Sequence, residues 1–256
     1  MSLNSNATAG SHSGAWETIK IVLQALAIAL FVRVFFYQPF NIPSGSMKKT
    51  LLVGDYLFVS KLSFGYSKFS FPFSPELFSG RIFGKEPTRG DVVVFRLPRD
   101  HSLDYIKRVI GLPGDEIQMK GGVLYINGTA VPKVRKGEFT TPEDEGVNQT
   151  IPVFEETLPN GVKYMVLDSE PSGPFDNTAV YKVPAGHYFM MGDNRDNSTD
   201  SRAAWGVSYV PYENLIGRAE VIFYSCASDE EGRCSWFTPW SWPFDIRWSR
   251  FFNLVR

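Results

Sequence analysis

The sequence has little of several residue types, and each shortage narrows the range of functions. Its 26 basic and 27 acidic residues give a formal net charge of -1, so no basic surface suggests nucleic acid as a partner. Histidine occurs three times and cysteine twice. After residue 37 no helical repeat of apolar residues is sustained, which excludes a helical bundle and favours a body that is mostly β.

The two cysteines, Cys226 and Cys234, have no metal-ligand pattern around them. In an oxidising compartment they can close a short disulfide loop. Two unpaired thiols fit the sequence almost equally well, because spacing alone does not show whether the bridging geometry is met.

One long apolar run is present, over residues 19–37, interrupted within its core by Gln24 and Arg33. A bilayer span needs about 20 mainly apolar residues and at least about 17, so we expect a transmembrane signal-anchor helix there. Residues 1–18 are small and polar, which predicts a disordered tail. A cleaved signal peptide is disfavoured because aromatic residues, not a small-x-small site, follow the run; a buried core helix is the remaining alternative.

Residues 38–256 should form the β body, with 17 Pro and 22 Gly in the chain marking its turns. Alternating and buried patterns predict strands at residues 91–95, 105–110, 162–167, 187–191 and 217–224, and a strand buried on both faces at 55–59. Residues 133–160 are polar and rich in turns, which predicts a surface insertion. Two aromatic-rich segments, 64–83 and 236–256, are expected to contact lipid or to pack in the core.

A small flexible turn follows the apolar run and offers hydroxyl groups to an incoming molecule. It reads Asn-Ile-Pro-Ser-Gly-Ser-Met over residues 41–47. Pro43 fixes one backbone angle, and Gly45 allows a bend that other residues resist. Such a turn can present a reactive serine, provided that a second group removes the hydroxyl proton.

Histidine is the usual base for a serine, and the chain has His12, His101 and His187. None lies in a Gly-x-Ser-x-Gly context, and each is more typical of a solvated or structural residue. A histidine-based triad completed by Asp193 or Asp200 stays formally open.

Lysine can act as the base if burial keeps its amine neutral. On the strand expected at residues 105–110, Lys107 shares a face with Tyr105 and Val109. Such a lysine is either desolvated or a solvated residue at a sheet edge, and the pattern by itself favours the edge.

Residues 192–202 form a third notable stretch, with three aspartates, two arginines, two asparagines and two serines. This density indicates a hydrogen-bonded network that holds other groups in place. A solvated acidic loop is an alternative. A cation-binding loop is another, although the calcium-loop pattern fails because no glutamate follows at the required spacing.

Together, residues 42–47, 89–95, 104–115 and 192–202 resemble, in order and spacing, the conserved motifs of bacterial type I signal peptidase (leader peptidase). The resemblance covers most of residues 37–224. It implies an antiparallel β protease core with an inserted second β region at about 116–185. It also implies four site residues: Ser46 as nucleophile, Lys107 as general base, Ser198 as the hydroxyl that orients the Lys107 amine, and Ser44 in the oxyanion hole with the Ser46 N–H.

The same resemblance implies the biological setting. Expected substrates are exported preproteins, cut after small-x-small sites, with no metal or cofactor. Expected partners are the phospholipid membrane and the secretion machinery, with a cytoplasmic tail, a single pass through the inner membrane and a periplasmic catalytic body. The chain departs from the family pattern at Lys49, where proline is usual, in having one apolar span where many relatives have two, and in its tryptophan-rich tail.

Two other functions remain open on sequence alone. One is a different serine–lysine hydrolase of the self-cleaving repressor type, against which the apolar span and the sequence around Lys107 count. The other is a membrane-anchored β binding module without turnover, in which residues 192–202 would form the recognition surface.

Overall fold

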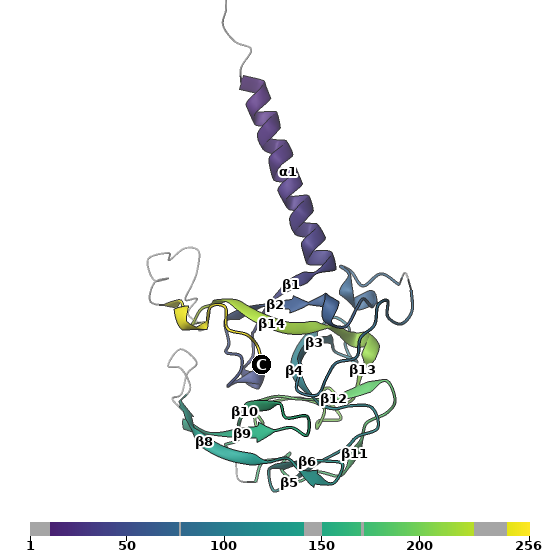
Figure 1. Ribbon diagram of the computed structural model, residues 1–256, viewed down its shortest axis with the longest axis vertical. Helices are drawn as coiled ribbons and strands as arrows, with labels where there is room; N and C mark the ends of the chain where they lie inside the picture. The colour runs from purple at the N-terminus through teal and green to yellow at the C-terminus, as the bar shows by residue number, and fades with distance from the viewer. Residues whose placement is uncertain (1–10, 77, 141–149, 170–171, 228–244) are drawn as a thin grey trace, which may run out of the picture.

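The computed structural model describes residues 11–76, 78–140, 150–169, 172–227 and 245–256. One helix, α1 (Ser11–Phe35), rises from a body of antiparallel strands (Figure 1). The later helical elements whose bounds both fall within those ranges are single 3-10 turns of three residues. The expectation of a mostly β body behind one apolar helix is therefore confirmed.

The helix α1 contains an apolar stretch of 22 residues, 14–35, with no side chain buried in the body. At 1.5 Å per residue this stretch is about 33 Å long, which suffices for a hydrocarbon core of about 30 Å. Residues 11–18, expected to belong to the tail, are helical, and residues 1–10 lie outside the described ranges. The helix ends at Phe35 because the first strand begins two residues later.

Seven strands form the main sheet in the order β1-β2-β14-β3-β4-β12-β13, and every neighbouring pair is antiparallel. In that order they are Tyr37–Asn41, Asp55–Ser60, Leu215–Ser225, Val92–Arg96, Asp104–Gly111, His187–Met191 and Val210–Pro211. The strand β4 lies inside the sheet, hydrogen-bonded to β3 on one side and to β12 on the other.

Two smaller sheets lie between β4 and β12 in the sequence. One has the order β11-β5-β6-β7 and the other β10-β9-β8. Their strands, β5 to β11, are Glu116–Lys120, Val123–Ile126, Thr129–Ala130, Lys133–Thr140, Thr150–Thr157, Lys163–Leu167 and Tyr181–Lys182. They form the end of the body away from α1 (Figure 1) and fall within the segment of about 116–185 expected as an insertion.

One expectation about strands is corrected, and one pair of strands was not predicted. Residues 133–160, expected as a surface insertion, contain β8 and β9, which pair with each other. The pattern was hidden because β8 is mostly exposed and carries polar residues on both faces. The strand β2 is not buried on both faces, since Tyr56 is 40% exposed while Leu57 and Val59 are fully buried.

The core positions the serine turn. Met47 and Leu51, which follow the turn, are fully buried in one apolar cluster with Leu57 and Val59 of β2. Burying side chains of this size stabilises a fold by about 1.5–3 kcal/mol each. The turn is therefore held by packing on its C-terminal side as well as by the sheet before it.

The two aromatic-rich segments were expected to contact lipid or to pack in the core. Phe64 and Phe69 are buried in the core, whereas Phe73 and Phe83 are 103% and 85% exposed, so the first segment divides between the two expected roles. In the second, residues 236–244 lie outside the described ranges, and residues 245–256 include an exposed Trp248.

Cys226 is disulfide-bonded, and Cys234 lies outside the part of the chain that the structure describes.

Candidate active site

Ser46 lies in a 3-10 turn, Gly45–Met47. A short stretch, residues 42–44, connects the end of β1 to this turn. Backbone bonds tie this stretch to the sheet: the Ile42 N–H donates to the Asp55 carbonyl at 2.9 Å, and the Gly54 N–H donates to the Ile42 carbonyl at 2.9 Å. Ser46 is 9% exposed and lines a cleft. The turn therefore presents the Ser46 hydroxyl from a fixed backbone.

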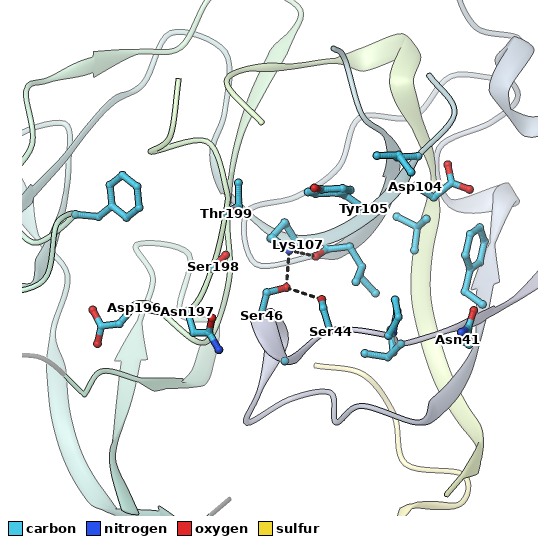
Figure 2. A pocket seen from close by; sticks show the side chains of 18 of the residues that line it. Asn41, Ser44, Ser46, Asp104, Tyr105, Lys107, Asp196, Asn197, Ser198 and Thr199 are labelled. Carbon is cyan, nitrogen blue, oxygen red and sulfur yellow. Dashed lines mark hydrogen bonds between the residues drawn. The ribbon is translucent and has the colours of Figure 1, made fainter. Parts of the chain in front are cut away.

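Lys107 lies opposite Ser46 on β4, with its amine directed at the serine hydroxyl (Figure 2). The distance from Lys107 Nζ to Ser46 Oγ is 2.7 Å, and the same amine donates to the Ile106 carbonyl at 2.9 Å. Lys107 is 3% exposed and belongs to an interior strand, where it pairs with Val93. The alternative of a solvated edge lysine is excluded, and the expected face shared with Tyr105 is confirmed by a distance of 5.4 Å from the amine to the ring centre.

The surroundings of Lys107 increase the fraction of its amine that is neutral. Burial lowers the pKa of the Lys107 amine from 10.5 to about 8, and the Asp200 and Asp193 carboxylates oppose this shift only in part. A pKa near 8 leaves roughly a tenth of the amine neutral at pH 7. A neutral amine in contact with a hydroxyl can accept its proton, so the molecules with a neutral Lys107 have the geometry and the charge state of a base and a nucleophile.

Ser44 stands at the rim of the cleft, beside the same hydroxyl. It is exposed, and its Oγ lies 3.4 Å from Ser46 Oγ. The cleft has a volume of about 630 Å³. Apolar side chains beside the serine, from Ile42, Val94 and Ile106, line part of it, so an extended peptide could lie along an apolar surface with its carbonyl next to Ser46.

Ser198 lies at the cleft but does not make the expected bond. Its side chain is 6% exposed, and its Oγ has no hydrogen-bond partner among the residues described. Space beside it is tight: a Cβ on Gly192 would lie 2.2 Å from Ser198 Oγ. The Lys107 amine donates instead to Ser46 and Ile106, so the orienting role of Ser198 stays a prediction.

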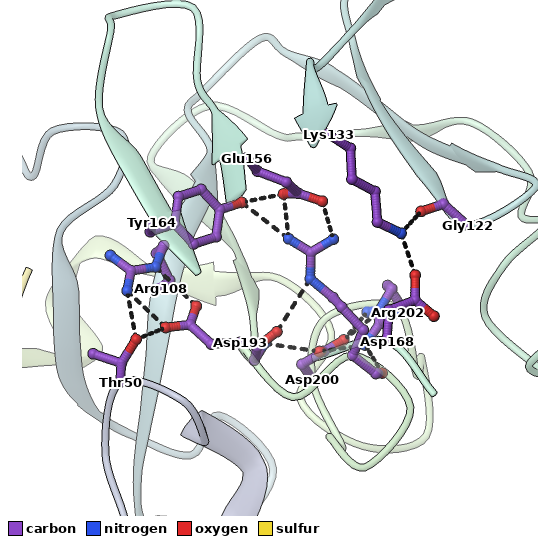
Figure 3. Close-up of polar contacts among 12 residues, drawn as sticks. Thr50, Arg108, Gly122, Lys133, Glu156, Tyr164, Asp168, Asp193, Asp200 and Arg202 are labelled. Carbon is purple, nitrogen blue, oxygen red and sulfur yellow. Dashed lines mark hydrogen bonds and ion pairs between the residues drawn. The ribbon is translucent and has the colours of Figure 1, made fainter. Parts of the chain in front are cut away.

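Residues 192–202 form a buried network rather than a solvated acidic loop. The Arg108 guanidinium donates to both Asp193 oxygens, at 2.8 and 2.6 Å, and Arg202 donates to both oxygens of Asp200, each at 2.9 Å (Figure 3). Burial would raise the pKa of Asp200, but the Arg202 charge and hydrogen-bond donors lower it overall. Arginines therefore occupy the carboxylates of Asp193 and Asp200, which argues against a cation bound by these two acids.

Comparison with known proteins decides the family. The family model for signal peptidase, peptidase S26, matches residues 15–224. The chain belongs to the S26 signal peptidase family. It is therefore a serine peptidase, a hydrolase, which excludes the binding module without turnover.

Individual relatives agree. The chain is 45% identical to signal peptidase I of Rickettsia conorii over 231 residues, which cover 87% of this chain and 82% of the relative. It is 46% identical to signal peptidase I of Rickettsia typhi over 209 residues, covering 78% and 76%. Among solved structures, a signal peptidase I from Enterococcus faecalis is 27% identical, with a TM-score of 0.30, covering 52% of this chain and 97% of that one.

No histidine lines the cleft among the residues described, so the geometry does not favour a histidine-based triad. The His101 ring packs edge-on against Phe69 at 4.9 Å, and His187 Nδ1 lies 2.9 Å from the Ala185 carbonyl. The side chain of His12 lies outside the described part of the chain.

The network predicted over residues 192–202 includes a direct support of the serine turn in this signal peptidase fold, a target that the sequence did not identify. The Asn194 N–H donates to the Ser46 carbonyl at 3.1 Å, and its side-chain amide donates to the Gly45 carbonyl at 3.0 Å. The last motif thus holds the backbone of the nucleophile turn. The sequence indicated a network over residues 192–202, but not that Asn194 binds the serine turn.

A second missed support comes from the inserted sheet. Glu156 of β9 is fully buried and accepts two hydrogen bonds from Arg195, at 2.9 and 2.6 Å, and one from the Tyr164 hydroxyl at 2.5 Å (Figure 3). Arg195 follows Asn194 directly. The insertion therefore braces the segment that holds the serine turn, and no local pattern around Glu156 indicated this.

Proposed function

We propose that the chain is a membrane-bound serine endopeptidase that removes signal peptides from exported preproteins through a Ser46–Lys107 dyad. The observation that carries this proposal is the 2.7 Å contact between a buried lysine amine and the Ser46 hydroxyl at the cleft. Membership of the signal peptidase family supports the substrate class.

In the acylation step, neutral Lys107 takes the proton of the Ser46 hydroxyl as the oxygen attacks the scissile carbonyl carbon. The carbonyl oxygen becomes an oxyanion, stabilised by the Ser44 hydroxyl and the Ser46 N–H. Protonated Lys107 then gives the proton to the leaving amine, the peptide bond breaks, and an ester remains on Ser46 Oγ. The mature protein leaves with its new N-terminus.

In the deacylation step, Lys107 takes a proton from a water molecule, which attacks the ester carbonyl carbon. The ester bond breaks, and Ser46 Oγ receives the proton from Lys107, so the signal peptide leaves with a free carboxylate. The unpaired Ser198 hydroxyl supports a further role, because it can accept a hydrogen bond from the amine when the serine proton has moved. An unpaired buried hydroxyl costs about 1–3 kcal/mol, which favours formation of such a bond.

Substrate choice would follow from the cleft surface next to Ser46. We expect the branched apolar side chains that line the cleft, Ile42, Ile106 and Val94, to leave room for alanine and to reject larger residues. This supports cleavage after small-x-small sites. A synthetic peptide with Ala-x-Ala before the cut should be processed, and a phenylalanine at either alanine position should prevent cleavage.

Membrane binding is supported by α1 and by aromatic residues on the sheet beneath it. Phe58 stacks on Phe223 at 4.3 Å and meets Tyr37 at 6.4 Å, on the face of the sheet opposite the core. Aromatic side chains are enriched where protein meets headgroups. We infer one pass of α1 through the inner membrane, a periplasmic body and contact with the secretion machinery.

The decisive experiment uses the full chain in phospholipid vesicles with a preprotein substrate. Ser46→Ala and Lys107→Met should each abolish release of the mature protein while circular dichroism still reports a folded β body. Ser63→Ala is a matched control, because the Ser63 hydroxyl bonds Glu220 at 3.2 Å and lies outside the cleft. Persistent processing by Ser46→Ala would reject the dyad, and processing without insertion of α1 would reject the anchor.

A further inference from the structure

The C-terminal end of α1 is unusual because partners outside the helix satisfy its last carbonyls. The last bond within the helix runs from the Phe36 N–H to the Val32 carbonyl, at 2.8 Å. The carbonyls of residues 33–36 therefore have no partner further along the helix, as at any helix end. In a helix that leaves a membrane on a flexible linker, water would satisfy them. Here the β body supplies the donors.

Lys61 provides most of these donors. It follows β2, is 1% exposed, and its amine donates to the carbonyls of Arg33 at 3.1 Å, Val34 at 3.3 Å and Ser70 at 2.5 Å. Its backbone N–H donates to the carbonyl of Phe36 at 2.9 Å. Lys61 thus binds two of the last three carbonyls of α1, those of Arg33 and Val34, and also the carbonyl of Phe36, which follows the helix.

Tyr66 binds the remaining one. Its hydroxyl donates to the Phe35 carbonyl at 2.5 Å. The Phe35 ring meets Tyr66 at 6.4 Å and Phe71 at 6.3 Å, both edge-on. The last three carbonyls of α1 and the carbonyl of Phe36 after it are therefore all bound by the body, and aromatic side chains pack around the contact.

The chemistry of Lys61 fits a charge placed at a helix terminus. Among the described residues no carboxylate pairs with its amine. Burial, and to a lesser degree the Arg33 charge, lowers the pKa of Lys61 to about 8. Below that pH the ammonium has three N–H donors for three carbonyls. The negative end of the helix dipole takes the place of an acidic partner.

The junction between α1 and the body is connected through β1 to the turn that carries Ser46. Only Phe36 separates α1 from β1, and β1 pairs with β2 from Tyr37, opposite Ser60. Figure 1 shows α1 meeting the body where β1 begins. The helix, the first strand and the turn that carries Ser46 therefore form one continuous segment without a flexible linker.

We propose that Lys61, with Tyr66, is a positioning residue that locks α1 to the catalytic body and so fixes the height of Ser46 above the bilayer. The inference rests on the proposed function as a membrane-bound signal peptidase. An extended substrate advances about 3.3 Å per residue. A hinge that moved Ser46 by that distance along the membrane normal would shift the cut by one residue, so the lock would set cleavage fidelity on membrane-inserted substrates.

The test compares two substrates with the full chain in phospholipid vesicles. Lys61→Met keeps the apolar stem and removes the amine, and Tyr66→Phe removes only the hydroxyl. Processing of an inserted preprotein by Lys61→Met should fall by about tenfold or more, and mass spectrometry should find new cleavage sites one or two residues away. Tyr66→Phe should show a smaller change of the same kind. Cleavage of a short soluble peptide should be unchanged in both.

Lys68→Met is the matched control, because Lys68 lies in the same loop but pairs with Glu76 at 3.2 Å. It should leave both substrates and the cleavage site unchanged. An unaltered rate and site on the inserted preprotein for Lys61→Met would overturn the proposal. So would an equal loss on both substrates, because that would show that Lys61 supports folding of the catalytic body.

A second readout does not depend on activity. Spin labels attached through unnatural amino acids at Leu30 on α1 and at Lys120 on β5 should give one narrow distance distribution, which Lys61→Met broadens. An unchanged distance distribution would contradict the proposal that Lys61 holds α1 in a fixed position on the catalytic body. If Ser46→Ala still processed the preprotein, the proposed function would fail, while the distance measurement would still decide the lock.

Discussion

Two buried lysines in this molecule share their burial and acidity and differ in their partners. Lys107 is 3% exposed and Lys61 is 1% exposed, and burial lowers the pKa of each to about 8. Lys107 faces the Ser46 hydroxyl in an open cleft, whereas the Lys61 amine faces backbone carbonyls, two at the end of α1 and that of Ser70. A hydroxyl can give up a proton and a carbonyl cannot. A lowered pKa therefore does not by itself identify a catalytic lysine; the group that it touches does.

The largest expected effect distinguishes the two lysines, and its absence would contradict the comparison. Lys107→Met should lower the cleavage rate of a soluble peptide by about 10⁴-fold, since it removes the general base. Lys61→Met should leave that rate unchanged. Rates measured on the two purified variants, each checked for folding by circular dichroism, decide the matter. Equal losses in the two variants would show that burial, and not the partner, determines the effect of removing a lysine.

The second largest effect is expected from removing a serine hydroxyl in the cleft, compared with a serine near Lys61. Ser44→Ala should lower kcat by about 10²–10³-fold with little change in KM, because it removes a donor to the oxyanion. Ser63→Ala, two residues from Lys61, should change neither constant. Steady-state kinetics on a small-x-small peptide provide the measurement. An increase in KM alone would assign Ser44 to substrate binding.

The sequence predicted the parts of the site that depend on local pattern. The four motifs indicated Ser46 and Lys107, and the strand at residues 105–110 put Lys107 on a face with Tyr105. Lys61 gave no such signal, because a lysine after a strand usually lies in solvent. Its burial depends on helix α1, which ends 26 residues earlier in the chain.

Local sequence patterns were also insufficient to predict other parts of the fold. The strands with clear apolar patterns, such as β3, β4 and β12, were predicted, and the polar β8 was not. Glu156 was missed because its partner Arg195 is 39 residues away and belongs to a different sheet region. Contacts between distant segments arise from topology, which local periodicity does not contain.

A tenfold effect is expected from pH. The neutral form of Lys107 is the active one, and its pKa is about 8. Consequently kcat/KM on a soluble peptide should fall by about tenfold for each pH unit below 8 and be level above it. Lys61→Met should show the same profile as the parent protein. A profile centred near 6.5, the usual pKa of histidine, would point to a different base.

The smallest effect is on stability. Ser198→Ala should raise the free energy of unfolding by about 1 kcal/mol or leave it unchanged, because the buried hydroxyl that it removes has no partner among the described residues. Urea unfolding gives the value. A lower cleavage rate in this variant would support a role for Ser198 beside the amine during catalysis. A large loss of stability would show that the hydroxyl is bonded in the resting protein.

The central claim is tested most directly by titrating the Lys107 amine itself. Nuclear magnetic resonance of the full chain with isotope-labelled lysine should find two amines with a pKa near 8, one absent in Lys107→Met and the other in Lys61→Met. A pKa near 10.5 for the signal lost in Lys107→Met would leave only about one amine in 3,000 neutral at pH 7, against about one in ten for a pKa near 8. The dyad could not then work as described.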